Sequence, residues 1–399
     1  MKRSIFLLLM LASFALQAQY KADNVKYTTV FPEDLCKTLL ASRGYLLLDV
    51  RSPGEYDDTS SNSGLNIGHL KNATNINISQ LPQRWKEIAS YKDQPVFIYC
   101  SHSQRSRRAS RLLADSGFTH IYNINGGLTD FYFQGIQADP CAGFTIESSV
   151  PYKIISPKQL NAKASSYYII DLRPDSIFNG ISTEATKVEG RFSEAVNIPF
   201  AKFMTQQAFL TKKPVLLIDE FGGQSPKAAK MLVDKGIKDV SILFDGMDGW
   251  FDYVTNTNDK LVAKWSRKID YEILPAEKFS KMTADKKSFA LIDVRTKEEF
   301  GNMSRSSWQN IGQIKGAVNI PAAELSSSAS LPSKETPVVL YGFNSQPLIF
   351  DAAKWFHDQG YKNVSVLQGG IWRLRWVSHN IKGKAYLNDL VVNVPAENE

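Results

Sequence analysis

The stretch Leu46-Leu-Leu-Asp49-Val-Arg51 decides the fold, because variants of it occur three times along the 399-residue chain. It recurs as Tyr168-Ile-Ile-Asp171-Leu-Arg173 and as Ala290-Leu-Ile-Asp293-Val-Arg295, so that the aspartates stand 122 residues apart each time. A repeat of this length is too long for a solenoid unit and matches a whole domain. The sequence therefore predicts three copies of one fold.

Two further blocks follow each copy in the same order. A block that begins at Gly68-His-Leu and ends at Asn75 returns from Gly190 and from Gly312. Next comes an apolar strand, which follows Pro95, Pro214 or Pro337. A loop and a helix come after it, and the helix stops at Gly117, Gly236 or Gly360. A second strand then leads to Asn125-Gly-Gly127, Phe244-Asp-Gly246 or Gln368-Gly-Gly370. Short apolar runs that alternate with helical stretches are typical of βα units. We predict an α/β fold in which each domain is a mainly parallel sheet flanked by helices.

The repeats divide the chain into four segments. The periodic pattern lapses near residues 138–152 and 257–270, where we expect linkers. The expected segments are a signal peptide over 1–18, a domain with the candidate nucleophile over 25–138, and domains without it over 152–257 and 270–382.

The N-terminus has the order of a secretory signal. Met1-Lys2-Arg3 precedes an apolar run from Ile5 to Leu16, and small residues around Ala18 offer a cleavage site. The run of about 14 apolar residues is shorter than the roughly 20 that cross a bilayer. We expect cleavage after Ala18, export to the periplasm and no integral membrane segment afterwards; an uncleaved anchor is the alternative.

Composition and charge exclude several classes of protein. With 43% hydrophobic and 22% charged residues, the chain is neither disordered nor a membrane bundle. The formal net charge is +7, and Lys2 and Arg3 supply two of these charges. The remaining basic residues are mostly scattered, which argues against a nucleic-acid partner but favours small anions.

The loop after the third strand of the first repeat carries a nucleophile, in Tyr99-Cys100-Ser101-His102-Ser103-Gln104-Arg105. A cysteine between the carboxyl end of a parallel strand and a helix lies where open α/β sheets bind ligands. Unsatisfied N–H groups and the positive end of the helix dipole favour an anion there, including a thiolate. The sequence thus places a nucleophile and an anion cradle in one loop.

At these blocks, over about residues 25–380, the chain resembles the rhodanese (thiosulfate sulfurtransferase) family. The resemblance rests on Asp-Val-Arg after a strand, the Gly-His-Leu block, Cys100 in its loop and Gly-Gly after the last strand. It implies double displacement: Cys100 takes a sulfur atom from a small anionic donor such as thiosulfate and passes the persulfide sulfur to cyanide, a thiol or an acceptor protein. Substrate contacts are expected from Ser101, His102, Ser103, Gln104 and Arg105, with Arg105 on the donor's sulfonate, and with no metal or cofactor.

Two features of the loop bear on its specificity. The common family form has Arg at the position of Ser101 and Gly at that of Ser103, and a serine is costlier if the latter position needs a positive φ. Four residues separate Cys100 from Arg105, whereas phosphatases that resemble this fold use five and so admit a tetrahedral phosphate. The tighter loop favours a single sulfur atom, and a phosphatase or arsenate reductase remains the alternative.

Several charged residues near these motifs have structural interpretations. We expect a solvent-exposed helix face, rather than a substrate-attracting surface, at Arg107, Arg108 and Arg111. His102 either protonates a leaving group or faces water, and His69 fits a strand end without a chemical role. Asp49 with Arg51, and Arg51 with Glu55, are expected to brace the sheet edge, because Asp-x-Arg persists in the repeats that lack the cysteine.

The second and third repeats lack the nucleophile. Asp219 and Gly342 stand at the position of Cys100, while Gln224 and Pro347 stand at that of Arg105. Together with Glu220, the second loop should repel an anionic donor. Both repeats are either structural walls or a cover or docking surface for the Cys100 cleft. The main alternative for the whole chain is a non-catalytic binding or sensing module.

The two other cysteines suggest a disulfide. In an exported protein an exposed thiol is liable to be captured, so function favours a Cys36–Cys141 bridge that leaves Cys100 free. The alternative is two unrelated thiols, one packed in the core and one in a linker.

Overall fold

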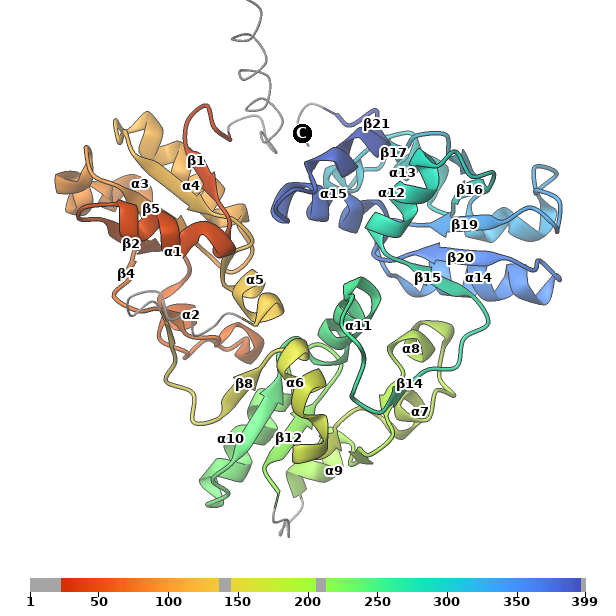
Figure 1. The fold of residues 1–399 in the computed structure, drawn as a ribbon, viewed down its shortest axis with the longest axis horizontal. Helices are drawn as coiled ribbons and strands as arrows, with labels where there is room; N and C mark the ends of the chain where they lie inside the picture. Colours follow the sequence, from red (N-terminus) through yellow and green to blue (C-terminus); the bar gives the residue numbers. More distant parts are fainter. Residues whose placement is uncertain (1–22, 136–144, 206–212, 396–399) are drawn as a thin grey trace, which may run out of the picture.

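The computed structural model describes residues 23–135, 145–205 and 213–395, which form three α/β domains arranged as a triangle (Figure 1). Each domain is built on one five-stranded parallel sheet with helices around it. The prediction of three copies of an α/β fold is confirmed. The predicted signal segment 1–18 lies outside the described residues. Within those residues, no helix has the length and apolar character needed to cross a membrane.

The first domain has the sheet order β1-β6-β5-β2-β4. Its strands are β1 (Thr28–Val30), β2 (Leu46–Asp49), β4 (Thr74–Asn75), β5 (Val96–Tyr99) and β6 (Ile121–Ile124). Its helices are α1 (Pro32–Ala41), α2 (Pro53–Tyr56), α3 (Leu81–Arg84), α4 (Gln104–Asp115) and α5 (Gly127–Gln134), with 3₁₀ turns over Ser63–Leu65 and Trp85–Tyr91.

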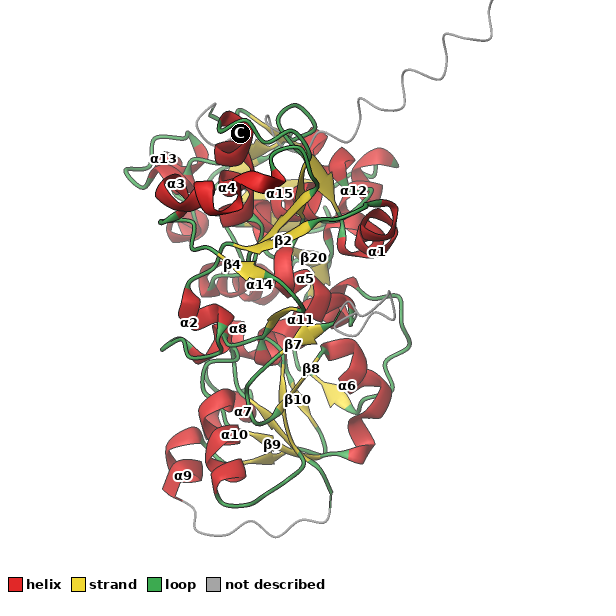
Figure 2. Cartoon of the chain, turned by 90° about the vertical axis from the view of Figure 1, so that its left-hand side faces the viewer, coloured by secondary structure: helices red, strands yellow, loops and turns green. Residues whose placement is uncertain are grey.

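The second domain repeats this order as β8-β13-β12-β9-β11. Its strands are β8 (Lys153–Ile155), β9 (Tyr168–Asp171), β11 (Val196–Asn197), β12 (Val215–Ile218) and β13 (Val240–Leu243). Its helices are α6 (Pro157–Lys163), α7 (Asp175–Phe178), α8 (Glu184–Glu189), α9 (Phe200–Thr205), α10 (Ser225–Asp234) and α11 (Gly246–Asn256). In the side view, α6 and α10 lie on opposite sides of these strands (Figure 2).

The third domain has the order β15-β20-β19-β16-β18. Its strands are β15 (Glu272–Leu274), β16 (Ala290–Asp293), β18 (Val318–Asn319), β19 (Val338–Tyr341) and β20 (Val364–Leu367). Its helices are α12 (Ala276–Ala284), α13 (Lys297–Phe300), α14 (Pro347–Asp358) and α15 (Gly370–Asn380), with 3₁₀ turns over Ser307–Gln309, Ala322–Ser327 and Ala385–Leu390.

The central strand of each sheet is apolar along its whole length. All four residues of β5 are buried, which is typical of a parallel strand covered by helices on both faces. On one face, Ala109 and Leu113 of α4 pack on the sheet, and on the other, Leu35 and Leu39 of α1 do so. The i, i+4 spacing of each pair presents one apolar stripe per helix to the core.

Glycines end the helix that follows the central strand, as predicted. Gly117, Gly236 and Gly360 have φ values of 88°, 86° and 87°, the left-handed conformation that closes an α-helix.

Short antiparallel strand pairs connect the end of each domain to its middle. They join β3 (His69–Leu70) to β7 (Ile146–Glu147), β10 (Arg191–Phe192) to β14 (Trp265–Ser266), and β17 (Gln313–Ile314) to β21 (Val391–Val392). His69 therefore lies in a strand, and its Nδ1 is 3.0 Å from the carbonyl oxygen of Tyr56.

Contacts between the three domains close the triangle. The first and second domains meet where Tyr132 stacks on Phe244, with ring centroids 4.6 Å apart. The second and third are joined by the ion pair of Asp252 with Arg373, at 2.6 Å. The third returns to the first through the carbonyl oxygen of His379, which accepts hydrogen bonds from domain 1. The equivalent helices α5, α11 and α15 border the centre of this arrangement (Figure 1).

Candidate active site

Cys100 lies where the sequence predicted, directly after β5 and before α4. Its side chain is free and only 1% exposed. Its Sγ lies 3.8 Å from the hydroxyl of Ser106, which in turn donates to the carbonyl oxygen of Ser103 at 3.0 Å. The sulfur is thus held at the base of the loop, against the first turn of the following helix.

Ser103 adopts a left-handed conformation with φ of 74°. Its counterpart in the second domain, Gly222, has φ of 72°, so the bend belongs to the loop rather than to the residue type. A non-glycine residue there costs about 1 kcal/mol. The serine hydroxyl offsets part of this cost by donating to Oδ1 of Asn125 at 3.3 Å.

The Gly126-Gly127 pair supports the loop from below. Leu128 N–H donates to the carbonyl oxygen of Cys100 at 3.0 Å, and Thr129 N–H donates to that of Ser101 at 3.1 Å. A Cβ on Gly127 would lie 2.3 Å from the Cys100 carbonyl oxygen. The motif is therefore needed because the chain passes too close to the nucleophile's backbone for any side chain.

Arg105 forms a two-pronged ion pair with Glu55. Its two terminal nitrogens lie 2.6 Å and 2.7 Å from the carboxylate oxygens of Glu55, and one of them also lies 2.9 Å from the hydroxyl of Ser101. Burial acts to raise the pKa of Glu55, but hydrogen bonds from Arg105 and Ser52 outweigh it and lower that pKa to about 2. The expected contact of Glu55 with Arg51 is wrong, since Glu55 instead braces the nucleophile loop.

The Glu55 ion pair should make stability depend on pH. Because its pKa falls from 4.5 to about 2 on folding, Glu55 contributes stability above pH 4.5 that is lost as the pH falls towards 2. At about 1.4 kcal/mol per pKa unit, Glu55→Gln should cost about 3 kcal/mol at pH 7 and much less at pH 3. Urea unfolding of both proteins at the two pH values measures this difference.

The control is Glu87→Gln, which removes an exposed carboxylate paired with Arg84 in the same domain. Surface pairs contribute little, so its loss should be small at both pH values. An equal loss for Glu55→Gln at pH 3 and pH 7 would show that the ionised carboxylate is not what stabilises the loop.

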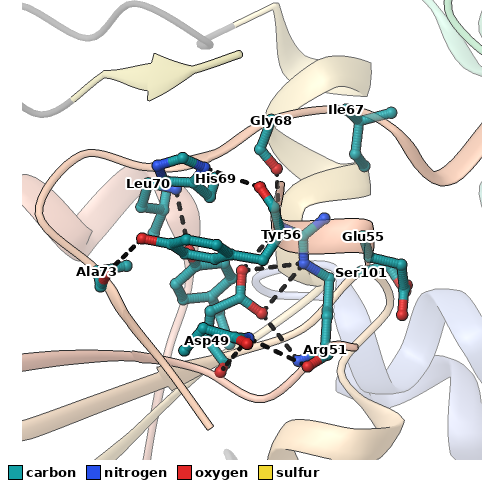
Figure 3. A network of polar contacts seen from close by, with 12 residues as sticks. Asp49, Arg51, Glu55, Tyr56, Ile67, Gly68, His69, Leu70, Ala73 and Ser101 are labelled. Carbon is teal, nitrogen blue, oxygen red and sulfur yellow. Dashed lines mark hydrogen bonds and ion pairs between the residues drawn. The ribbon is translucent and has the colours of Figure 1, made fainter. Parts of the chain in front are cut away.

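The Asp-x-Arg motif forms a buried polar network at the edge of the sheet. Arg51 binds Asp49 at 2.7 Å and the carbonyl oxygen of Gly68 at 2.7 Å, and it lies between them in Figure 3. Tyr99 accepts a hydrogen bond from Leu70 N–H beside it. The same arginine contacts recur in the other domains, with Asp171 and Gly190 and with Asp293 and Gly312. The expected structural role of Asp49 with Arg51 agrees with these contacts.

In the second domain, the loop equivalent to the nucleophile loop binds a carboxylate. The carboxylate of Asp219, at the position of Cys100, accepts hydrogen bonds from the backbone N–H groups of Gly222, Gln224 and Ser225. A carboxylate inside the domain therefore occupies the anion cradle. The corresponding N–H groups in the first domain belong to Ser103, Arg105 and Ser106.

The third domain has no side chain at the nucleophile position. Gly342 follows β19, and α14 begins at Pro347, the counterpart of Arg105, as the sequence predicted for a proline at a first helical turn. Ser345 at the position of Ser103 accepts a hydrogen bond from Gly369 N–H at 2.9 Å.

The arginines of α4 divide into two kinds. Arg108 and Arg111 are exposed, as expected. Arg107 is 5% exposed, so its assignment to a solvated face is wrong. It donates to Asn125 and to the carbonyl oxygen of His379 at 3.2 Å, and Asn125 donates to the same oxygen at 2.8 Å. The third domain therefore buries this arginine.

The rim of the loop opens onto a cleft of about 830 Å³ between the three domains. His102 and Gln104 line it, together with Phe221 and Asn344, which are the counterparts of His102 in the other domains. Partial desolvation, then the charge of Arg105, lower the pKa of His102, and its Nδ1 lies 2.8 Å from the Ser101 hydroxyl. The side chain is nevertheless exposed, on the wall of the cleft. No cluster of metal-ligating side chains occurs among the described residues.

Of the two cysteines in the predicted disulfide, Cys36 lies within the described residues. Cys36 lies in α1 and is disulfide-bonded, whereas Cys100 is free. Cys141 lies outside the described residues, so its pairing stays a prediction.

The sequence did not indicate the roles of three residues near the nucleophile. Glu55 ends a Ser-x-x-Glu capping box at α2, a pattern that is visible in the sequence but does not name a partner 50 residues away. Ser106 recurs as Ser225 in the second loop, which could have drawn attention to it. His379 has no sequence signal, because only the packing of domain 3 on domain 1 brings it to Asn125.

Comparison with known proteins gives family matches in all three domains. Residues 33–134, 156–253 and 275–373 each match the rhodanese-like domain family. The uncharacterized protein YqhL of Bacillus subtilis is 40% identical over 104 residues, which are 25% of this chain and 74% of YqhL. The tRNA uridine(34) hydroxylase of Cronobacter sakazakii is 26% identical over 114 residues, 28% of this chain. The chain covers only 32% of that hydroxylase.

Among solved structures, the thiosulfate sulfurtransferase of Pseudomonas aeruginosa aligns over 86% of this chain and 66% of its own. The identity is 19% and the TM-score 0.24, so this likeness carries no functional argument. The family matches alone cover well over half of the chain. The chain therefore belongs to the rhodanese family, as a protein of three tandem rhodanese-like domains.

Proposed function

We propose that this protein is a sulfurtransferase that moves sulfane sulfur from a small anionic donor, such as thiosulfate, to a nucleophilic acceptor through a persulfide on Cys100. The observation that carries the proposal is the carboxylate of Asp219 in the equivalent loop, which receives three backbone N–H groups. A loop of this shape binds an anion when Asp is present. With Cys100 in its place, the same donors can stabilise a thiolate and the negative outer sulfur of a persulfide.

The reaction balances without a redox partner. In the first step the Cys100 thiolate attacks the outer sulfur of thiosulfate, the donor's S–S bond breaks and sulfite leaves with the electron pair. One proton is taken up to give the neutral persulfide. In the second step an acceptor thiolate attacks the outer persulfide sulfur, and Cys100 leaves as a thiolate. Cyanide serves as acceptor in the same way and yields thiocyanate.

The loop residues have distinct proposed roles. Ser103 holds the left-handed bend. The N–H groups of Ser103, Arg105 and Ser106, the counterparts of those that bind Asp219, would bind the sulfur. Arg105 fixes the loop through Glu55 and Ser101 and adds positive charge near Cys100. The hydrogen bonds with Glu55 raise the pKa of Arg105 most, burial lowers it, and the nearby Cys100 sulfur raises it further. His102 and Gln104 contact substrates that enter from the cleft. The hydroxyl of Ser101 joins Arg105 to His102.

Arg105→Ala should raise KM for thiosulfate by about fivefold to tenfold, since a charge-assisted contact is worth about 1.5–3 kcal/mol and Arg105 shares its charge with Glu55. Arg108→Ala is the control, because that side chain is exposed on the same helix. Steady-state kinetics with thiosulfate and cyanide measure both. Equal KM values in the two variants would indicate a diffuse field rather than a donor contact.

The other candidates make different predictions. If the protein is a non-catalytic binding or sensing module, the parent has no turnover and Cys100→Ser keeps its ligand affinity. If it is a sulfurtransferase, Cys100→Ser loses the turnover that the parent shows. A phosphatase or arsenate reductase would turn over phosphate esters or arsenate in place of thiosulfate. We further propose that the protein acts after export, in the periplasm, on small molecules or an acceptor protein and without nucleic acid.

A further inference from the structure

The cleft between the three domains has the character of a ligand site. Its volume of about 830 Å³ lies in the range of small-molecule pockets, which often form between domains. Aromatic side chains from two domains open into it without being covered. Phe221, Trp308 and Trp372 remain 62%, 58% and 45% exposed. Large aromatic groups that protein does not cover, in a concave surface, favour an occupant with a flat or apolar body.

Two carboxylates in the wall have no direct polar partner among the described residues, although the charge of Arg373 acts on both. Asp245 and Asp248 are only partly exposed, and within the described residues neither carboxylate makes a hydrogen bond or an ion pair. Asp252 beside them is paired with Arg373. Burial first, then neighbouring carboxylates, raise the pKa of Asp245 to about 7 and that of Asp248 to about 6. A bound cation would favour the ionised form of both carboxylates, and so would oppose the effects of burial and of the neighbouring carboxylates on their pKa values.

Asp245 takes a conformation that the other domains assign to glycine. It stands at the position of Gly126 and Gly369, and its φ of 57° is left-handed like theirs. A side chain costs about 1 kcal/mol at such a position. Here it places a carboxylate in the cleft wall.

The other ionisable groups of the cleft wall, besides Asp252, are two guanidinium groups and two histidines. Arg373 is neutralised by Asp252 and stacks on Trp376, 4.4 Å from the ring centroid. Arg375 adds one positive charge to the wall. Burial, followed by the charges of Arg375 and Arg107, lowers the pKa of His379 to about 3, so this histidine is neutral. With Arg373 paired to Asp252, Asp245 and Asp248 stand against Arg375 alone, and a cation bound beside them would favour their ionised forms over their protonated forms.

We propose that this cleft binds the sulfur acceptor and selects a thiol carried on a small organic cation, which lies between the aromatic side chains and is paired with Asp245 and Asp248. The proposal rests on the proposed function of Cys100. His102 and Gln104 of the nucleophile loop line the same cleft, so a thiolate bound there can approach the persulfide. The step is R–S⁻ + Cys100–S–SH → R–S–SH + Cys100–S⁻, with one S–S bond broken and one formed. An ammonium group against aromatic faces gains further attraction.

Binding is tested on the full mature chain with benzyltrimethylammonium as probe, followed by tryptophan fluorescence, since Trp308, Trp372 and Trp376 line the cleft. The cation should bind at least about tenfold more tightly than phenylacetate, which corresponds to a single favourable charge contact. Asp245→Gly should lose most of this preference. It should also fold at least as well as the parent, because glycine suits the left-handed position.

Asp239→Asn is the matched control, since this exposed carboxylate of the same domain does not line the cleft. It should leave the affinity for the cation unchanged. A preference for phenylacetate, or undiminished cation binding in Asp245→Gly, would overturn the proposal.

Transfer is tested by discharging the persulfide with cysteamine or with 3-mercaptopropionate. The ratio of kcat/KM for the cationic to the anionic thiol should fall about fivefold or more in Asp245→Gly relative to the parent protein. An unchanged ratio contradicts the acceptor role. These outcomes are separate from the proposed function: if Cys100 forms no persulfide, sulfur transfer fails whatever the cleft binds, whereas a normal persulfide with no charge preference refutes the acceptor site alone.

Discussion

Replacing Cys100 with alanine should lower the rate of sulfur transfer from thiosulfate to cyanide by at least several orders of magnitude. The reason is that the covalent intermediate forms on this sulfur, and the equivalent positions hold Asp219 and Gly342, which cannot form a persulfide. Steady-state kinetics of the purified mature protein measure the loss.

The fold should survive this substitution. Cys100 is buried in an apolar cluster and contributes little volume, so Cys100→Ala should give a circular dichroism spectrum like that of the parent. Asp219→Ala is the matched control, because it alters the equivalent loop of the second domain without touching the nucleophile. Residual activity above a few per cent in Cys100→Ala would refute the assignment.

Gly127→Ala should have the largest effect on stability and also abolish transfer. The added Cβ would lie 2.3 Å from the carbonyl oxygen of Cys100 and 2.6 Å from the carbonyl carbon of Ser101. Relief requires the nucleophile loop itself to move, since these contacts are with backbone. Left-handed strain and overpacking together predict a loss of about 3 kcal/mol or more in the unfolding of the first domain.

Gly117→Ala separates strain from steric conflict. Gly117 has a φ of 88°, but the nearest atom to its added Cβ is the flexible Nζ of Lys92 at 3.6 Å. This control should lose only about 1 kcal/mol and keep its activity. Urea unfolding and thiosulfate kinetics on both variants give the comparison; similar losses in the two would mean that close packing on Cys100 is unimportant.

The repeats made the fold predictable from sequence. Three copies of Asp-x-Arg after an apolar strand, at a constant spacing, specify one α/β domain three times, because strand burial and sheet-edge bracing depend on local pattern. The position of Cys100 followed from the same pattern, since a loop between a parallel strand and a helix has one place in this architecture. The positive φ at Ser103, foreseen as a cost, is present at 74°.

Contacts between segments that are distant in the sequence could not be predicted from it. Arg105 binds Glu55, and nothing in the spacing of the two favours this pair over Arg51 with Glu55. The side chain of Arg107 is buried because the third domain packs over it, and Asn125 and the carbonyl oxygen of His379 accept its hydrogen bonds. Such partners depend on how three domains pack, which residue periodicity within one domain does not encode.

The most direct test for a persulfide on Cys100 is the mass of the protein after incubation with thiosulfate. We expect an increase by the mass of one sulfur atom, located on the peptide that contains Cys100. The added mass should be lost on adding cyanide and should be absent from Cys100→Ser. A mass that does not change, or a sulfur atom found on another residue, would contradict the assignment of Cys100 as the sulfur carrier.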